Sequence, residues 1–362
     1  MLSPNYNIAP ARLPTDRGVV RILVNQARER ILARSHTGPK QNDWRDQLRD
    51  AFRRPAELLS FLELEDTAAA SAVQTPFPML VPRAFASRMR RGDSNDPLLR
   101  QVLPDPGELD SRPGYVSDPV GDHGSRQVRG LLHKYHGRAL LITTGACAIH
   151  CRYCFRQNYP YGDEHLGRRL APALDYIRTR SDISEVILSG GDPLMLDTER
   201  LQQLGDALGL IGHIRRLRIH TRLPVVLPDR IDESFCGWLH NLPWPVVVVI
   251  HANHPAEFDP SVDQAIQRLR NAGAHVLNQT VLLAGINDNE EILAELMERS
   301  FAAGVIPYYL HLLDKVSGAA RFDSEPAVAG QLLERLRVRL PGYLVPRLVR
   351  EEAGAPYKLP VL

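Results

Sequence analysis

From Ala139 onward, short apolar runs rich in β-branched residues alternate with stretches whose apolar positions recur every three to four residues. The first pattern predicts buried strands and the second predicts amphipathic helices. Apolar strands that alternate with helices are typical of a parallel sheet covered by helices. The predicted strands are 139–144, 185–189, 216–221, 246–251, 275–282 and 307–312, and the predicted helices lie near 167–180, 197–210, 230–241, 260–272, 288–303 and 325–339.

These strand–helix units are too few to close an eight-fold barrel, so the predicted fold class is α/β, an open (β/α)6 partial barrel. A last strand is expected within 343–350. N-terminal to the barrel, helices are expected over 16–32, 44–52 and 55–64, the last with Pro in its first turn. The stretch 76–127 is rich in Pro, Gly and Asp and predicts irregular structure. The expected organisation is an N-terminal helical and irregular region (1–130), the barrel (131–340) and a C-terminal segment (341–362).

The composition and charge of the chain argue against a role at nucleic acid or at a membrane. The chain has 362 residues and a formal net charge of +2 without a long basic block, which argues against nucleic acid as a partner. No charged stretch followed by an apolar one begins the chain, so we expect no signal peptide. The apolar run 245–250 is far too short to span a bilayer, and a membrane partner is not expected. Free thiols fit the reducing cytoplasm, which is the expected localisation.

Polar residues cluster where the predicted strands end. Because the carboxyl ends of parallel strands meet at one mouth of a barrel, these residues are expected to form one site. They are the cysteine loop after the first strand, Ser189–Asp192 after the second, Thr221 and Arg222 after the third, 251–253 after the fourth, Asn278 and Gln279 in the fifth, and Asp314 after the sixth.

Three cysteines, Cys147, Cys151 and Cys154, stand in a C-x3-C-x2-C pattern directly after the first strand. Three thiolates this close can hold three irons of a [4Fe–4S] cluster and leave the fourth iron open for a ligand. The loop resembles that of the radical S-adenosylmethionine (SAM) enzymes. A disulfide framework is disfavoured because the chain has only four cysteines and three of them are crowded together.

Zinc is the alternative metal for this loop, and it would need a fourth ligand, for which His150 and His133 are the candidates. The fourth cysteine, Cys236, is interpreted as a small buried apolar residue on a helix.

The segment Ser189, Gly190, Gly191 and Asp192 resembles the second radical SAM motif. Glycines allow the backbone to approach a ligand closely, here the methionine amino group of SAM. A glycine-rich turn after a strand is the alternative interpretation. Three further residues are candidates to bind SAM, namely Arg222 at the carboxylate and His251 and Gln279 at the sulfonium or ribose; for each, a satisfied polar residue at the barrel rim is the alternative.

From the first helix to the end, the chain resembles the lysine 2,3-aminomutase family of radical SAM enzymes. The similarity is carried by the cysteine loop, by Ser189–Asp192, and by the segments 77–82, 96–104, 135–138, 250–255 and 307–310. The resemblance implies pyridoxal 5′-phosphate (PLP) on a lysine near the C-terminus, which is Lys358 here, because an amine can form and exchange a Schiff base with a substrate amine. It places Lys134, Tyr135 and Arg138 at the PLP phosphate.

The same resemblance implies the substrate contacts. Arg156 stands where the family grips the substrate carboxylate, a task suited to the guanidinium fork. Asp314 stands where the distal ammonium of lysine is paired. The second carboxylate of that pair is an aspartate in the family and is Glu351 here, one methylene longer. His311 occupies the position of a family tyrosine.

The segment 311–322 and the short stretch after Lys358 resemble the bacterial elongation factor P branch of the family. This implies an isomerase that makes (R)-β-lysine from L-lysine, a separate ligase that attaches the product to elongation factor P, and an electron donor such as flavodoxin or ferredoxin. An aminomutase for glutamate or arginine is an alternative; the acidic pair Asp314 and Glu351 argues against an anionic side chain. A zinc or iron–sulfur binding protein that contacts ribosome or RNA is a second alternative, and an inactive scaffold is disfavoured because every expected cofactor position is filled.

Overall fold

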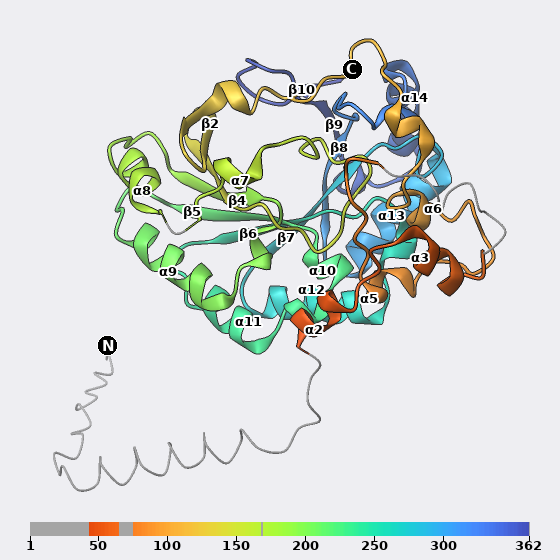
Figure 1. Cartoon of the computed structure of the whole chain (residues 1–362). Helices are drawn as coiled ribbons and strands as arrows, with labels where there is room; N and C mark the ends of the chain where they lie inside the picture. Colours follow the sequence, from red (N-terminus) through yellow and green to blue (C-terminus); the bar gives the residue numbers. More distant parts are fainter. Residues whose placement is uncertain (1–42, 65–74, 168, 362) are drawn as a thin grey trace, which may run out of the picture. The chain divides into compact units, whose positions relative to one another are not determined.

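The computed structural model describes residues 43–64, 75–167 and 169–361 (Figure 1). The helix expected over 16–32 lies outside these residues. The whole fold described below lies within the unit Trp44–Leu362. The boundaries expected at 130 and 340 stay a prediction.

A single sheet runs through the unit Trp44–Leu362 in the strand order β1 to β10, with each strand hydrogen-bonded to the next one in sequence. The pairs from β3 to β9 are all parallel. The six strands predicted from the sequence are confirmed as β3 (Arg138–Thr144), β4 (Glu185–Gly190), β5 (Arg216–Thr221), β6 (Val246–Ile250), β7 (His275–Val281) and β8 (Ile306–His311). The last expected strand is β9 (Arg347–Arg350).

Three strands that the sequence did not predict extend this sheet at its two ends. At one end β2 (Leu131–Tyr135) pairs antiparallel with β3, and β1 (Arg126–Val128) pairs antiparallel with β2. At the other end β10 (Leu359–Pro360) pairs antiparallel with β9. Among the described strands β1 and β10 are the two edges, so the sheet is an open partial barrel, as predicted.

Helices cover the outer side of the parallel strands (Figure 1). In α12 the buried residues Val262, Ala265, Ile266 and Leu269 follow the helical period, and Asp259 caps the first turn by accepting from the N–H groups of Ser261 and Val262 at 3.0 Å. The helices between the strands are α8 (Ala171–Arg178), α9 (Thr198–Gly209), α11 (Glu233–His240), α12 (Pro260–Asn271), α13 (Glu290–Ala302) and α14 (Pro326–Arg339), all close to the predicted ranges.

The described residues before the barrel, 43–64 and 75–125, form short elements joined by irregular chain, which agrees with the expectation for 76–127. The longer helices expected there are confirmed in shortened form as α2 (Trp44–Arg49) and α3 (Pro55–Phe61).

Other short helical elements lie both before the barrel and between its strands. They are α5 (Arg83–Ala86), α6 (Pro97–Arg100), α7 (Tyr161–Glu164), α10 (Leu223–Val226), η1 (Pro106–Leu109), η2 (His123–Ser125), η3 (Pro193–Met195), η4 (Pro228–Arg230), η5 (Pro255–Glu257), η6 (Ala320–Phe322) and η7 (Gly342–Leu344). None of the helices in the described part of the chain combines the length and the apolar character needed to cross a bilayer.

Candidate active site

A cavity of about 920 Å³ opens at the carboxyl ends of the parallel strands. The cluster, cofactor and substrate residues predicted from the sequence line it, together with Thr221 and His311, whereas Ala252, Asn253 and Asn278, which were expected at the same mouth, do not. The strand ends therefore do converge on one mouth, and they bring the cysteine loop and the C-terminal segment into the same space.

The cysteine loop is clamped from outside by the irregular N-terminal segment. The buried Arg152 inside the loop pairs with Glu108 and donates to the carbonyls of Phe77 (2.9 Å) and Pro78 (3.2 Å). The backbone N–H of Arg152 donates to the carbonyl of Gln101 (2.9 Å). Removing one partner of a buried ion pair is costly, so this arrangement fixes the loop and gives the N-terminal segment a structural task.

The three thiols of the loop face the cavity and form no disulfide. Burial raises the pKa of Cys154 to about 12 and that of Cys147 well above its usual range. Thiols that resist ionisation in the free protein become thiolates when a metal centre supplies the compensating charge, so the donor set fits an iron–sulfur cluster.

Among the described residues no three His, Cys, Asp or Glu side chains are gathered to hold a single ion. The two histidines considered as zinc ligands make other contacts: His150 Nδ1 lies 2.9 Å from the Pro78 carbonyl, and His133 Nδ1 lies 3.0 Å from the Tyr176 hydroxyl. Cys236 lies on a helix as expected, α11, but it is only partly buried where it packs against the core.

The two glycines at the end of β4, Gly190 and Gly191, are required by the cysteine loop itself. A Cβ at Gly190, whose φ is +124°, would lie 2.6 Å from the Thr144 carbonyl oxygen, and a Cβ at Gly191 would lie 2.3 Å from the Ala146 carbonyl oxygen. The N–H groups of Gly191 and Asp192 donate to these same carbonyls at 2.8 Å. The close approach that the sequence led us to expect toward a ligand is therefore made toward the backbone of the loop.

Neighbouring protein groups donate hydrogen bonds to the Asp192 carboxylate. It accepts from the N–H groups of Leu194 (3.0 Å) and Arg222 (2.7 Å) and from the Thr221 hydroxyl (2.7 Å). Burial raises the pKa of Asp192 to about 6 in spite of these donors. Asp192 thus holds the ends of β4 and β5 together.

Arg222 is buried beside the cysteine loop. Its guanidinium donates to Cys151 Sγ, to Gln101 Oε1 and to Glu257 Oε2. Here the structure places protein partners around the side chain that the sequence analysis assigned to the carboxylate of SAM.

Several buried polar atoms of the cavity wall have no hydrogen-bond partner within the described residues. Gln279 Oε1, His220 Nε2 and His311 Nε2 are among them. Burial, with the charges of Arg222 and Lys358, lowers the pKa of His251 to about 4, so this ring is neutral at physiological pH. Buried polar groups are normally satisfied, and a cavity with several unsatisfied ones fits a polar ligand.

The C-terminal strands bring Lys358 and Glu351 together. Antiparallel pairing sets Leu359 of β10 opposite Arg350 of β9, so the next residues outward, Lys358 and Glu351, face each other and form an ion pair. Asp314 follows β8, the parallel neighbour of β9, and lies at the same end of the sheet.

A chain of charges links the two sides of the cavity. Lys134 Nζ lies 3.0 Å from Glu351 Oε1 and 2.7 Å from Asp122 Oδ1, and Asp122 Oδ2 accepts from Arg156 Nε (2.7 Å). Burial alone would raise the pKa of Glu351, but Lys358 and Lys134 hold it at about 2. The two ionised carboxylates, Asp122 and Glu351, pair with three cations, which are Lys134, Arg156 and Lys358. This group of five side chains therefore keeps a net positive charge that attracts an anionic ligand.

Asp314 is the acidic group of this region that forms no ion pair within the described residues. Burial, reinforced by the nearby charge of Glu351, raises the pKa of Asp314 to about 7. An added ammonium would be its natural partner.

Tyr135 and Arg138, expected at the PLP phosphate, lie next to Lys134 on the wall formed by β2 and β3. The Arg138 guanidinium lies 4.8 Å from the centre of the Tyr135 ring.

Sequence reasoning missed several residues of this site. Asp122 stands in irregular chain, and no spacing signalled it. Arg218 and His220 on β5 also line the cavity, and here a signal existed. Polar residues alternate with apolar ones along β5 in a sheet whose other face carries helices, so the polar positions must face the barrel interior.

An open parallel barrel with the three thiols of a C-x3-C-x2-C loop at its mouth defines a radical SAM protein. The solved structures compared include a radical SAM methyltransferase from Sphaerobacter thermophilus, which is 16% identical with a TM-score of 0.43 and covers 61% of this chain and 68% of that one. A scan against models of known protein families finds no match.

Curated relatives define the particular family. The chain is 44% identical to the L-lysine 2,3-aminomutase of Escherichia coli (strain K12) over 89% of its length and 95% of that protein. It is 42% identical to the enzyme of the same name from Haemophilus influenzae (91% and 98%) and 33% identical to that from Clostridium subterminale (89% and 78%). The chain therefore belongs to the lysine 2,3-aminomutase family. This membership makes it an isomerase of the radical SAM class, with a [4Fe–4S] cluster and SAM as the cofactors that go with the family.

Proposed function

We propose that this chain moves the amino group of L-lysine from the α-carbon to the β-carbon and so forms (R)-β-lysine. One observation carries the proposal: a single cavity joins three cluster-type thiols, the amine of Lys358, and an acidic pair opposite an arginine. The relatives named above act on lysine according to their names, which supports the same substrate here.

In this proposal the cofactors divide the cavity between them. Cys147, Cys151 and Cys154 would hold the cluster beside SAM, and Lys358 would carry PLP with Lys134, Tyr135 and Arg138 at its phosphate. When bound, the cluster and SAM supply a radical that removes hydrogen from carbon, and PLP supplies an electron sink for the migrating nitrogen. The surplus of cations around Asp122 and Glu351 is suited to the phosphate.

The chain's own residues position the substrate and exclude water. Arg156 lies next to Ser189, to whose hydroxyl it donates (3.1 Å), and Asp122 orients its guanidinium. Although burial alone would lower it, Asp122 raises the pKa of Arg156, so the cation is permanent and suited to a carboxylate. At the other end, Asp314 would accept the distal ammonium, while Glu351 holds Lys134 and Lys358 in place.

Replacing Asp314 by asparagine is expected to raise the KM for L-lysine by about 10²-fold or more, because a buried ammonium loses its charged partner. In the unmodified enzyme the affinity for lysine should fall as the pH drops through about 7, since protonation of Asp314 removes the same charge. The measurement is steady-state kinetics within about one unit on either side of that pH, and the substitution should abolish this dependence.

Asp323 supplies the matched control for Asp314. It is a nearby carboxylate that pairs with Lys315 (3.5 Å) and does not line the cavity, so Asp323→Asn should leave the KM unchanged. An Asp314→Asn enzyme with an unaltered KM and an unaltered pH profile contradicts the role given to Asp314.

The function as a whole is tested by anaerobic incubation of the purified protein with SAM, PLP, dithionite and L-lysine, followed by chromatography for β-lysine. Iron and sulfide analysis of the same sample distinguishes a four-iron cluster from a single zinc ion. SAM cleavage without β-lysine points to another amino acid as substrate, and a sample without iron rejects the proposal.

We also propose that the β-lysine serves the modification of elongation factor P by a separate ligase, in the cytoplasm, with a flavodoxin or ferredoxin as reductant. The similarity of 311–322 to that branch of the family supports this. The test is the intact mass of elongation factor P from cells that lack the gene: a mass equal to that from unaltered cells contradicts this part of the proposal.

A further inference from the structure

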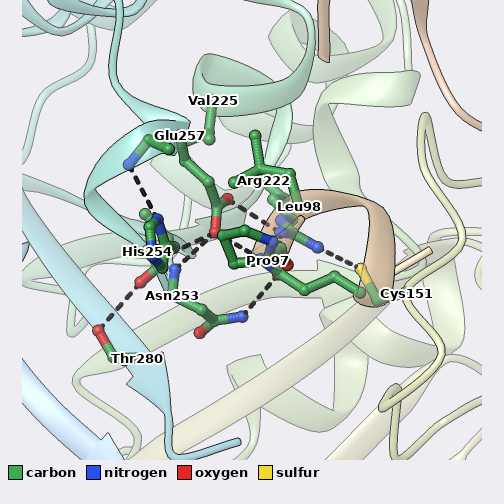
Figure 2. Close-up of polar contacts among 12 residues, drawn as sticks. Pro97, Leu98, Cys151, Arg222, Val225, Asn253, His254, Glu257 and Thr280 are labelled. Carbon is green, nitrogen blue, oxygen red and sulfur yellow. Dashed lines mark hydrogen bonds and ion pairs between the residues drawn. The ribbon is translucent and has the colours of Figure 1, made fainter. Parts of the chain in front are cut away.

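Arg222 lies at the centre of a buried polar group directly behind the cysteine loop. It follows β5, and 7% of its side chain is exposed. Its Nη2 donates to Gln101 Oε1 (2.7 Å) and to Glu257 Oε2 (2.9 Å), and its Nη1 donates to Cys151 Sγ (2.6 Å). Figure 2 shows Arg222 between Glu257 on one side and the sulfur of Cys151 on the other.

The position of the Glu257 carboxylate is set by contacts other than its ion pair with Arg222. The Glu257 side chain is fully buried on η5, and its Oε1 accepts from the N–H groups of Asn253 (2.8 Å) and His254 (3.2 Å) (Figure 2). Gln101 is fully buried as well, and its Oε1 also accepts from Asn253 Nδ2 (3.1 Å). Backbone donors thus hold the carboxylate, and the carboxylate and amide hold the guanidinium, so the direction of the remaining Nη1–H is set by the fold.

The contacts of the Arg222 guanidinium favour a role toward the cysteine loop over a role in binding the carboxylate of SAM. One end of its fork is committed to two protein acceptors, and the other end is aimed at a cysteine that the proposed function gives to the cluster. A carboxylate of SAM that engaged the fork would have to displace Glu257 from a site with preformed backbone donors. Leaving the Glu257 charge buried and unpaired would be strongly unfavourable.

We propose, resting on the proposed function, that Arg222 is a positioning residue which donates a charge-assisted hydrogen bond to the Cys151 thiolate and thereby sets the reduction potential of the cluster, with Glu257 as its counter-charge. Hydrogen bonds to cluster sulfurs and nearby net charge are the levers by which a protein tunes such potentials. Reduction adds one negative charge to the cluster, so a cation beside a ligating sulfur favours the reduced state. Glu257 opposes this effect and limits it.

The two charges therefore predict shifts of opposite sign. Arg222→Gln removes the cation and should make the midpoint potential more negative. Glu257→Gln removes the anion, keeps an amide of the same shape, and should make the potential more positive. We expect each substitution to change the equilibrium constant for one-electron reduction by about tenfold, which corresponds to about 59 mV. Arg222→Lys, which keeps the charge, should lie closer to the unmodified enzyme than Arg222→Gln does.

The experiment is an anaerobic redox titration of the full-length holoenzyme without SAM, followed by electron paramagnetic resonance of the reduced cluster. Glu185→Gln is the matched control, because Glu185 forms a largely buried pair with Arg218 (2.6 Å) at the start of β4, at the opposite end of the strand from the cysteine loop. Its potential should equal that of the unmodified enzyme. Iron content and thermal unfolding are measured for each variant.

Opposite shifts for the two substitutions support the proposal. Loss of the cluster in Arg222→Gln combined with a positive shift in Glu257→Gln also supports it, since the second variant keeps Arg222. An unchanged potential in Glu257→Gln overturns it, and so does an Arg222→Gln enzyme that has a normal potential but binds SAM weakly.

Failure of this inference is distinguishable from failure of the proposed function. Unmodified enzyme that forms β-lysine, but whose potential is insensitive to both substitutions, rejects the role of Arg222 alone. Unmodified protein without iron rejects both.

Discussion

Replacement of Lys358 by alanine is expected to abolish β-lysine formation, with a loss of about 10³-fold or more, while the iron–sulfur cluster stays intact. The reason is covalent: the amine of Lys358 is the proposed anchor for PLP, and no other side-chain chemistry substitutes for an amine in a Schiff base. The cysteines lie on the loop after β3 and Lys358 lies just before β10, so the cluster does not depend on this side chain.

Lys358 also carries a positive charge within an ion-pair network, and the test must separate the loss of this charge from the loss of the PLP anchor. Lys358 pairs with Glu351, which also holds Lys134. Alanine removes the cation and leaves Glu351 with one partner, so part of any defect reflects the altered charge network. Arginine at position 358 keeps the cation beside Glu351 but cannot form the Schiff base. Lys358→Arg should therefore be as inactive as Lys358→Ala while disturbing Glu351 less.

The measurement is borohydride reduction of the PLP-loaded protein, followed by peptide mass spectrometry to locate the labelled lysine. Label on Lys358 in the unmodified protein, and none in either variant, is the expected result. Lys134 is the informative competitor because it shares Glu351 with Lys358. Label on Lys134, or PLP retained covalently by Lys358→Ala, shows that the anchor has been assigned to the wrong residue.

Two of the parallel strands, β4 and β6, were predictable because they are buried in the body of the sheet. All six residues of β4 are buried, and β6 is nearly so, which produces the apolar runs that mark their positions in the sequence. β2 escaped prediction for the complementary reason. Its residues Leu131–Tyr135 end in polar side chains, and its strand character comes from antiparallel pairing with β3, a contact between segments that periodicity does not report.

The residues of the site were predictable where a motif carries them and not where only the fold assembles them. The cysteines and Lys358 stand in recognisable local patterns. Gln101 and Glu257 are far apart in sequence and meet only because the segment after α6 packs against η5. Asp122 reaches Arg156 and Lys134 from irregular chain, and it is held there by the Asp118 carboxylate, which accepts from the Asp122 N–H (2.9 Å).

The roles of individual side chains were harder to predict than their positions. Asp192 and Arg222 both line the cavity as expected, yet neighbouring protein groups engage the carboxylate of Asp192 and both terminal nitrogens of Arg222. A spacing pattern shows that a charged residue stands near a site. It does not show whether that charged side chain already forms a buried ion pair or hydrogen bond within the protein, because the partner comes from a distant part of the sequence.

Cys151→Ser is expected to eliminate the intact four-iron cluster and all SAM cleavage. Serine is a harder ligand than a thiolate and matches iron in a sulfide cluster poorly, so one iron loses its protein anchor. The same substitution removes the sulfur to which Arg222 donates and leaves a buried guanidinium facing a smaller atom. Both effects act at the loop, and the effect on lysine turnover should be complete because the radical that starts the reaction is no longer formed.

The fourth cysteine supplies an internal control for this prediction. Cys236 lies on α11 and does not line the cavity, so Cys236→Ser should keep full iron content and full SAM cleavage and lose only a little packing. Iron and sulfide analysis of anaerobically purified protein, together with chromatography for 5′-deoxyadenosine after addition of dithionite, compares the two variants directly. Equal iron and equal SAM cleavage in both variants contradicts the assignment of Cys151 as a cluster ligand. If both variants lose iron, the loss cannot be ascribed to the C-x3-C-x2-C loop, since one of them leaves that loop unchanged.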